Sequence, residues 1–262
     1  MKSVKFSKED QAAIMKSLDE QDFETFISYF RNTDLIVECE YMLTRQKQKL
    51  APTENAQFTI GRVSYYVQIT EMIKIKIQNE WAGFIKGRIY FKPEDIDNRD
   101  DEFQKLQECT SKDLFLTDIT QWFLSTTFVQ KIKVDPIDMF VEGTIVLDDD
   151  HFYTRAEYNT KLQEFNPPIN EWLIYCNCKR LYDPKEDYIL CEFCNNWIHY
   201  TCSGKSDKEL KNISKIKFIC LACVDQNQNK KKKLSNVQEY STQDGDSTKI
   251  RSFNTTHGKK KK

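Results

Sequence analysis

Seven of the nine cysteines in this chain of 262 residues lie between Cys176 and Cys223, and His199 lies among them. These eight residues form four pairs, each with only one or two residues between its members. The pairs are Cys176 and Cys178, Cys191 and Cys194, His199 and Cys202, and Cys220 and Cys223. Short spacing lets one turn present two ligands to the same ion, and structural zinc takes four thiolate or imidazole ligands in a tetrahedron. The pattern therefore predicts two zinc sites in a segment too short for a large core of its own.

The other two cysteines, Cys39 and Cys109, stand alone and are expected to be buried structural thiols. The composition is 39% hydrophobic and 30% charged, which excludes a wholly disordered chain. No stretch approaches the roughly 18 apolar residues of a spanning helix, and the first ten residues, MKSVKFSKED, contain no apolar run typical of a secretory signal. We therefore expect a soluble intracellular protein without disulfides, because that compartment is reducing.

The net charge of −1 is a sum over unlike parts. From Gln226 onward the chain has ten Lys and Arg residues against three acidic residues, so this tail carries +7 and residues 1–225 carry −8. The tail has almost no apolar residues and is expected to be disordered. Its tetralysine clusters, Lys230–Lys233 and Lys259–Lys262, are typical of nuclear import signals and can also contact DNA phosphates without sequence preference. The acidic body suits cationic partners.

Period-two alternation predicts a β-rich body. In VSYYVQITEMIKIKI every second residue from Ile73 to Ile77 is isoleucine, and further strand-like runs are FIKGRIYF, KDLFLTD, FVQKIKV and GTIVL. Ser7 is the expected N-cap of a preceding amphipathic helix, and Pro167 and Pro168 mark a short stiff linker. We expect a mainly β (α+β) chain with an N-terminal helical extension (1–22), a β-rich domain (23–165), a linker (166–171), a zinc finger (172–226) and a disordered lysine-rich tail (227–262).

The order of four cysteines, one histidine and three cysteines resembles the PHD finger, whereas a RING finger places its histidine fourth among the ligands. The resemblance implies a cross-brace in which the first and third pairs bind one zinc ion and the second and fourth pairs bind the other. Trp197, in NWIH, and Phe218, two residues before Cys220, add to it, and Phe218 is assigned to the small core. Catalytic zinc needs an open coordination position, and two closed tetrahedra leave none, so no enzymatic activity is expected.

Four aromatic residues of the finger match the positions of a methyl-lysine cage. Tyr175, Tyr182, Tyr188 and Trp197 have the spacings seen in PHD fingers that read trimethyl-lysine, such as that of the bromodomain PHD finger transcription factor. A trimethylammonium group keeps its charge but donates no hydrogen bond, so an aromatic box recognises it by cation–π attraction and burial of the methyl groups. The alternative is that a finger with little core uses these aromatics for packing.

The rest of the peptide groove follows from the same resemblance. It implies that the N-terminal segment of histone H3 adds as a strand beside residues 188–191, and that Glu192 contacts the arginine two residues from the amino end of the peptide. An exposed glutamate without such a role is the alternative. The free amino terminus of the peptide is expected at backbone carbonyls near residues 216–218.

The segments YYVQITEMIKI, GRIYFKPEDI, DLFLTDI and FYTRAEYN recur in this order in bromo-adjacent homology (BAH) domains, and the resemblance covers about residues 23–165. It implies a β-rich partial barrel. A BAH domain followed by a PHD finger is similar to plant chromatin proteins that read two histone marks, and Tyr66 and Phe91 match two aromatics of the BAH cage in those proteins. Ile89 and Ile119 replace the other two contacts, and an aliphatic wall offers no quadrupole to a cation. We therefore expect a protein-interaction or nucleosome-docking module here.

These observations predict a nuclear, non-enzymatic reader of histone H3 trimethylated at the lysine in its fourth position. The expected cofactors are two zinc ions. The expected partners are the H3 tail, the nucleosome, other subunits of a chromatin complex and DNA through the basic tail, with no membrane. Two alternatives remain at this point: a structural subunit whose finger merely folds, and a RING-like ubiquitin ligase, which the order of the ligands disfavours.

Overall fold

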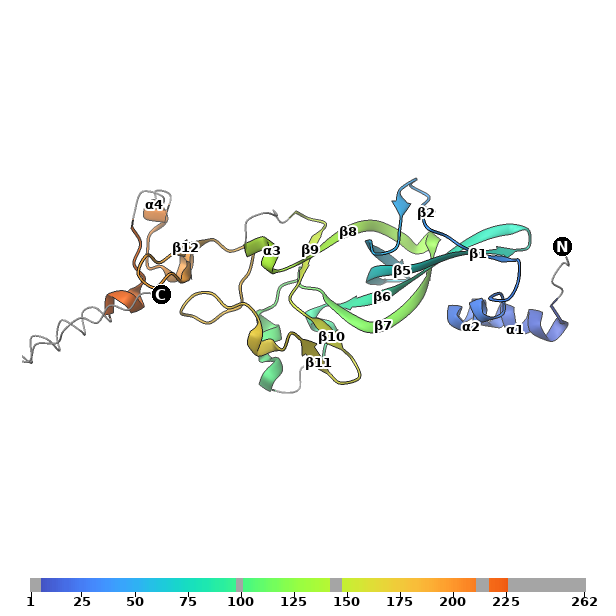
Figure 1. Cartoon of the computed structure of the whole chain (residues 1–262), viewed down its shortest axis with the longest axis horizontal. Helices are drawn as coiled ribbons and strands as arrows, with labels where there is room; N and C mark the ends of the chain where they lie inside the picture. The colour runs from blue at the N-terminus through green and yellow to red at the C-terminus, as the bar shows by residue number, and fades with distance from the viewer. Residues whose placement is uncertain (1–5, 98–100, 142–147, 211–216, 226–262) are drawn as a thin grey trace, which may run out of the picture. The chain divides into compact units, whose positions relative to one another are not determined.

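The computed structural model describes residues 6–97, 101–141, 148–210 and 217–225 (Figure 1). The predicted tail, with both tetralysine clusters, lies outside these described residues. The chain divides into two compact units, Met1–Asp187 and Tyr188–Lys262. No described helix is long and apolar enough to cross a membrane.

One mixed sheet dominates the first unit, and its described strands follow the order β11-β10-β7-β6-β5-β4-β8-β9, with β1 paired to β5. Neighbours are antiparallel, except that β10 is parallel to β7 and β9 is parallel to β8. The strands are β1 (Ile36–Glu38), β4 (Asn55–Ile60), β5 (Val63–Ile77), β6 (Glu80–Phe91), β7 (Phe115–Leu124), β8 (Phe128–Pro136), β9 (His151–Thr154), β10 (Glu157–Asn159) and β11 (Glu164–Asn166). The prediction of a mainly β chain is confirmed.

The longest pair of strands, β5 and β6, shows why this sequence forms a sheet. Ile73 and Ile75 of β5 are buried, and Lys74 between them is exposed, as the period of two requires. The register between the strands shifts next to Gly87 of β6. A Cβ atom on this residue would overlap the side chain of Val67 and the backbone of β5. Glycine therefore permits the close approach of the two strands at this bulge.

The helix predicted from Ser7 is confirmed as α1 (Lys8–Asp19), and Ser7 forms a reciprocal capping box with Asp10. A second helix, α2 (Phe23–Ser28), follows a turn in which Gln21 has a φ of 58°. Both helices pack on the sheet. Their shared core with the sheet consists of Ile14, Phe23, Phe26, Ile27, Phe30, Ile73, Ile75, Phe84 and Trp122. The predicted helical extension is thus packed against the β-rich domain.

A second core lies where β7, β10 and β11 meet the segment that follows them. Trp172 stacks on Phe115 with 5.5 Å between ring centroids, and its Nε1 donates a hydrogen bond to the Pro167 carbonyl at 3.0 Å. Ile169 and Leu181 are buried in the same core. The segment predicted as a linker, residues 166–171, is therefore fixed to the first unit by packing.

Short elements complete the described chain. Two hairpins are formed by β2 (Met42–Leu43) with β3 (Lys49–Leu50) and by β12 (Tyr188–Leu190) with β13 (Trp197–His199). The remaining α-helices are α3 (Asp138–Val141) and α4 (Asp207–Leu210). The 3-10 helices are η1 (Pro93–Asp95), η2 (Asp101–Glu108), η3 (Ser125–Thr127), η4 (Ile169–Glu171) and η5 (Tyr200–Cys202). The lone thiols Cys39 and Cys109 are half-buried rather than fully buried, and burial raises the pKa of Cys109.

Candidate metal centres and peptide groove

Four sulfur atoms of the second unit form one candidate metal centre, from Cys191, Cys194, Cys220 and Cys223. The Cys191 and Cys223 sulfurs lie 4.0 Å apart, and those of Cys194 and Cys220 lie 3.9 Å apart. A tetrahedron with Zn–S bonds of about 2.3 Å has edges of roughly 3.8 Å. A disulfide needs about 2.05 Å. The four thiols are therefore spaced as ligands of one zinc ion.

The backbone around Cys191 prepares its sulfur for a metal. The Cys220 N–H points at the Cys191 sulfur at 3.3 Å. Burial alone would raise the pKa of this thiol, but hydrogen bonds from the backbone N–H groups of Cys220, Cys194 and Phe193 lower the pKa to about 6. Asn195, with a φ of 55°, follows Cys194 and donates its N–H to the Cys191 carbonyl at 2.9 Å, in a conformation that asparagine tolerates well. These hydrogen bonds favour the thiolate form of Cys191, which is the form that binds zinc.

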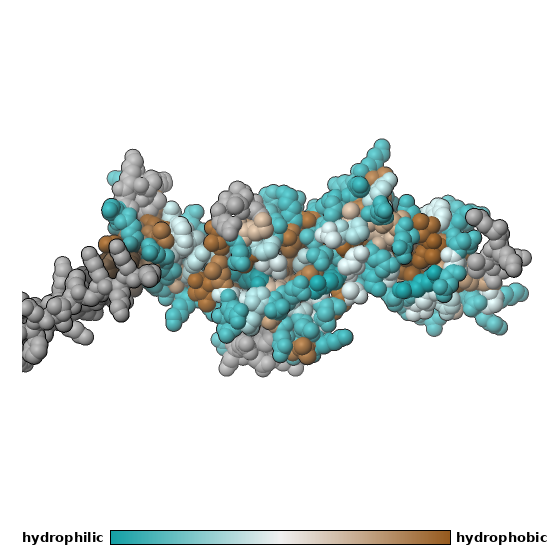
Figure 2. Space-filling view, viewed as in Figure 1, coloured by the Kyte–Doolittle hydropathy of each residue, from teal (hydrophilic) through white to brown (hydrophobic). Residues whose placement is uncertain are grey.

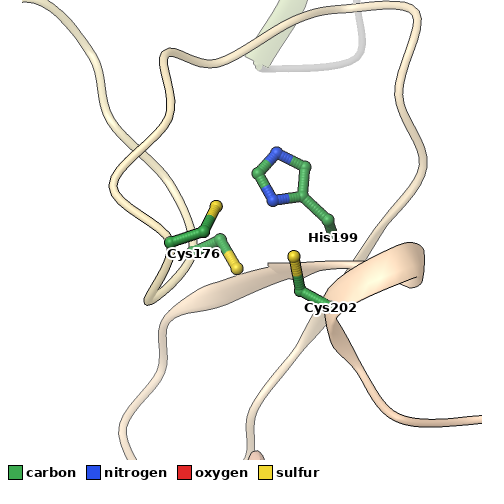
Figure 3. A group of neighbouring side chains, drawn as sticks. Cys176, His199 and Cys202 are labelled. Atoms are coloured by element: carbon green, nitrogen blue, oxygen red, sulfur yellow. The ribbon is translucent and has the colours of Figure 1, made fainter.

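The other candidate centre consists of Cys176, Cys178, His199 and Cys202, whose ligand atoms lie within 4.8 Å of one another. Figure 3 shows the side chains of Cys176, His199 and Cys202 converging on a common point. His199 ends β13, and Cys202 ends η5. Cys176 and Lys179 have φ values of 69° and 59°, which turn the chain sharply around the first ligand pair. Three thiols and one imidazole form a donor set typical of structural zinc.

The structure brings the eight predicted ligands into the two predicted groups, and this fits the prediction of two zinc ions. Bound zinc would crosslink four segments that are separated in sequence. Each group supplies four protein donors, which complete a tetrahedron, so the chemistry of both centres is structural.

The first ligand pair lies in a loop, residues 173–187, that folds with the first unit. The Glu108 carboxylate accepts a hydrogen bond from the Leu181 N–H at 2.8 Å. Lys105 donates to the Lys179 carbonyl at 2.7 Å. Both Lys105 and Glu108 belong to η2, and the Leu181 side chain enters the second core. We call residues 173–187 the anchored loop.

A buried ion pair adds a further anchor. Arg155 Nε donates to Asp113 Oδ1 at 2.6 Å, and Arg155 Nη2 donates to the Tyr182 carbonyl at 2.7 Å. Both side chains of the pair are at most 1% exposed. Asp113 also accepts the Thr110 N–H at 2.7 Å. The sequence did not predict a role for Glu108, Asp113 and Arg155. Their hydrogen-bond partners lie 27 to 73 positions away in the chain, and no local spacing pattern indicates such contacts.

Two of the predicted cage residues belong to the anchored loop. The rings of Tyr175 and Tyr182 are 5.3 Å apart and nearly perpendicular, at 73°. Tyr182 is only 8% exposed, and its hydroxyl donates to the Phe140 carbonyl of α3 at 3.4 Å. The two rings therefore contact each other edge to face within the first unit, and the bond to Phe140 fixes the Tyr182 ring there.

The other two predicted cage residues lie on the β12–β13 hairpin. Tyr188 pairs with His199, and Leu190 pairs with Trp197. Tyr188 and Trp197 therefore share one face of the hairpin as diagonal neighbours, while Ile189 and Ile198 point to the opposite face. Trp197 is 40% exposed, a large aromatic surface open to solvent.

Glu192 lies two residues after the end of β12, and its side chain is half-exposed. Its carboxylate lies 3.9 Å from the Lys217 ammonium, and its backbone N–H donates to the Phe218 carbonyl at 3.0 Å. Phe218 is buried, as expected for a core residue of the finger. In the expected capture site for the peptide amino terminus, residue 216 lies outside the described residues.

The predicted remnant of a BAH cage lies at a separate cavity of about 590 Å³. Tyr66, Phe91 and Ile89 line it, whereas Ile119 does not. The ring of Tyr66 lies 5.1 Å from that of Phe152 and 5.2 Å from the Lys92 ammonium. A cation of the chain itself therefore already lies at the Tyr66 ring.

Fold and sites together define a β-rich domain joined to a small finger with two zinc centres. Residues 176–223, which contain all eight ligands, match the PHD-finger family profile. The prediction of a PHD finger is thus confirmed.

Relatives extend the likeness beyond the finger. The chain is 28% identical to the chromatin remodeling protein SHL of Arabidopsis thaliana over 169 residues, which are 64% of this chain and 69% of SHL. It is 27% identical to the chromatin remodeling protein EBS of the same plant over 158 residues, 60% of this chain and 62% of EBS. Nucleosome-remodeling factor subunit NURF301 of Drosophila melanogaster is 36% identical over 50 residues, 19% of this chain and 2% of that protein.

Among solved structures, the crystal structure of the yeast Rsc2 BAH domain matches with a TM-score of 0.38 and 15% identity. The match covers 50% of this chain and 54% of that one.

Proposed function

We propose that this protein is a nuclear, non-enzymatic chromatin reader whose PHD finger binds the histone H3 tail trimethylated at its fourth-position lysine. Tyr175, Tyr182, Tyr188 and Trp197 form the cage in this proposal, and Glu192 contacts the peptide arginine. The β-rich domain serves as the nucleosome- or protein-docking module. The names of the relatives support the chromatin setting, because all three belong to chromatin- or nucleosome-remodeling proteins.

The observation that carries the proposal is that each segment supplying ligands to the Cys176 centre also carries two of the four aromatics. Tyr175 and Tyr182 flank its first ligand pair, and Tyr188 and Trp197 lie on the hairpin that supplies His199. A zinc ion shared by these two segments would hold the two pairs of rings in a fixed relation. An electron-rich box of this kind selects a methylated ammonium by cation–π attraction and by burying methyl groups that an unmodified lysine lacks.

The hairpin also provides the surface for the peptide backbone. In the described residues β12 pairs only with β13, so β12 is an edge strand, the kind of strand to which an extended peptide adds. Glu192 lies two residues after β12 and carries a half-exposed carboxylate, a group that forms charge-assisted contacts with arginine.

The test is a calorimetric titration of the whole chain with H3 N-terminal peptides that are unmodified or mono-, di- or trimethylated at the fourth-position lysine. The whole chain is required because Trp172 and Leu181 are core residues of the first unit. We expect the affinity for the peptide to rise with methylation. Trp197→Ala should lower the affinity for the trimethylated peptide at least about tenfold, because a cation–π contact contributes about 0.5–2 kcal/mol and burial of the methyl groups adds to it.

Trp81→Ala is the matched control, because Trp81 is also a half-exposed tryptophan, at the turn between β5 and β6. It should leave the peptide affinity unchanged. Equal affinity for unmodified and trimethylated peptides, or equal effects of the two tryptophan variants, would contradict the cage.

A further inference from the structure

The β2–β3 hairpin projects from the sheet of the first unit (Figure 1), and residues 45–49 at its end are exposed. Met42 and Leu50 at its base are buried against Phe58, Ile69 and Phe123 of the sheet. Thr44 closes the turn by donating its N–H to the Gln48 carbonyl at 2.9 Å and accepting the Lys47 N–H at 2.9 Å. In Figure 2 the outer end of this projection is coloured as hydrophilic. A firm base thus holds a polar tip, residues 45–49, away from the sheet.

The tip has an unusual charge for this protein. Its sequence is RQKQK, and residues 41–53 contain three cations and no acidic residue, although residues 1–225 together carry −8. All five side chains of the tip are exposed and end in hydrogen-bond donors. Arg, Lys and Gln are residues that proteins commonly use to contact DNA phosphates.

The three cations of the tip have no anionic partner in the described part of the chain. Arg45, Lys47 and Lys49 form no ion pair there, whereas Lys86, Lys105, Lys131 and Lys133 each pair with a carboxylate. Lys49 instead lies 4.6 Å from the ring of the exposed Tyr41. The charges of the tip are thus available to an external anion.

Lys47 occupies a position that suits another residue better. Its φ of 60° lies in the left-handed region, which glycine and asparagine adopt more readily than lysine does. A lysine here supplies charge at a turn position where it does not favour the fold.

We propose that the β2–β3 hairpin is a binding site for the phosphate backbone of duplex DNA, formed by Arg45, Lys47 and Lys49 with donors from the glutamines between them. A cationic projection on an acidic body concentrates attraction for a polyanion at one place. A two-stranded hairpin is also narrow enough to follow a groove of the duplex. This site does not depend on the methyl-lysine cage, because no residue is shared.

The test measures the affinity of the whole chain for a short fluorescein-labelled duplex DNA by anisotropy, over a range of salt concentrations. Arg45→Ala/Lys47→Ala/Lys49→Ala is compared with Lys8→Ala/Lys74→Ala/Lys161→Ala, which removes the same charge from three exposed lysines far apart in the sequence. The basic tail is present in every variant, so its contribution is constant. The hairpin variant should flatten the slope of log K against log salt by about 2.7, at about 0.9 for each lost phosphate contact.

The control variant should change the slope by less than half as much. Equal slopes for the two triple variants would overturn the proposal and assign DNA binding to the tail or to net charge. Lys47→Asn separates affinity from folding, because asparagine suits the left-handed turn and carries no charge. It should weaken DNA binding while leaving the melting temperature unchanged or raised. An unchanged affinity would remove Lys47 from the site.

Discussion

The two zinc centres have similar ligands but different surroundings. Half of the Cys176 centre lies on the anchored loop, which the first unit holds through Glu108, Arg155 and the core around Trp172. The Cys191 centre lies wholly in the second unit, where its ligands contact one another and the Cys220 backbone. The anchored loop has contacts with the first unit that do not depend on metal, whereas a metal ion at the Cys191 centre would join residues of the second unit alone.

This difference bears on the proposed cage. Tyr175 and Tyr182 belong to the anchored loop, and Tyr188 and Trp197 belong to the β12–β13 hairpin, which supplies the ligand His199. Loss of zinc should thus disperse the second pair of rings while leaving the first pair near its native place.

Zinc removal has the largest expected effect. Structural zinc in isolated fingers contributes on the order of 10 kcal/mol to folding. With a chelator, amide hydrogens of residues 188–225 should exchange as in an unfolded chain. The Leu181 N–H, bonded to Glu108, and the Tyr182 N–H, bonded to the Leu173 carbonyl at 3.0 Å, should keep measurable protection. Hydrogen-exchange mass spectrometry measures the exchange of both regions, and the amides of β5 and β6, which should stay protected, serve as the internal standard.

If residues 173–187 lose protection together with residues 188–225, the anchored loop depends on metal as much as the hairpin does. The comparison of the two centres would then fail.

Arg155→Met has the next largest expected effect, on the free energy of unfolding of the first unit. It leaves Asp113 buried without its cation and removes the bond to the Tyr182 carbonyl, so the free energy of unfolding should fall by about 3–5 kcal/mol in urea denaturation. Arg31→Met breaks the exposed pair with Glu24 and should cost at most about 1 kcal/mol. A double variant with Asp113→Leu should recover part of the loss, because no buried charge remains.

The loss of unfolding free energy in Arg155→Met should also depend on pH. Burial raises the pKa of Asp113 in the folded state, and Arg155 opposes this rise. Without Arg155 the pKa of Asp113 rises further above its unfolded value of 3.8, so the folded state is favoured by protonation. The destabilisation should therefore be smaller at pH 5 than at pH 8. A loss that is equal at both pH values would show that Asp113 is not the buried charge responsible.

Local patterns made one part of this molecule predictable. The spacing of the ligand pairs predicts the zinc sites. Alternation around Ile73 and Ile75 predicts the strand β5, and the N-cap residue Ser7 predicts the start of α1. In each case the residues that act together are neighbours in the chain, so their physical relation is written in a short window.

Local sequence patterns did not predict contacts between residues that lie far apart in the chain. Pro167 and Pro168 suggested a linker, but Trp172 packs on Phe115, more than 50 positions earlier. No spacing rule connects Arg155 to Asp113 either. The resemblance to BAH domains already indicated that Ile89 and Ile119 replace two expected cage contacts, whereas no sequence pattern predicted that the Lys92 ammonium lies at the Tyr66 ring.

A smaller effect distinguishes anchoring from peptide contact. Glu108→Ala leaves the Leu181 N–H without its acceptor and should lower the free energy of unfolding by about 1–3 kcal/mol. The variant should retain most of its affinity for the trimethylated peptide. Glu192→Ala removes a half-exposed carboxylate with a distant partner, so stability should change by less than about 1 kcal/mol while peptide affinity falls. In urea denaturation Glu108→Ala should lose more stability than Glu192→Ala, and in calorimetric titration Glu192→Ala should lose more peptide affinity than Glu108→Ala.

Tyr182→Phe has the smallest expected effect. The variant keeps the aromatic ring of the proposed cage and removes only the hydroxyl that donates to the Phe140 carbonyl. At 3.4 Å this bond is long, so the free energy of unfolding should fall by about 0.5–1 kcal/mol, and affinity for the trimethylated peptide should stay within about twofold of the parent. Tyr182→Ala should lose both stability and binding. If Tyr182→Phe instead binds the peptide as poorly as Tyr182→Ala, the hydroxyl rather than the ring face serves recognition, and the anchored loop contributes a hydrogen bond instead of a cage wall.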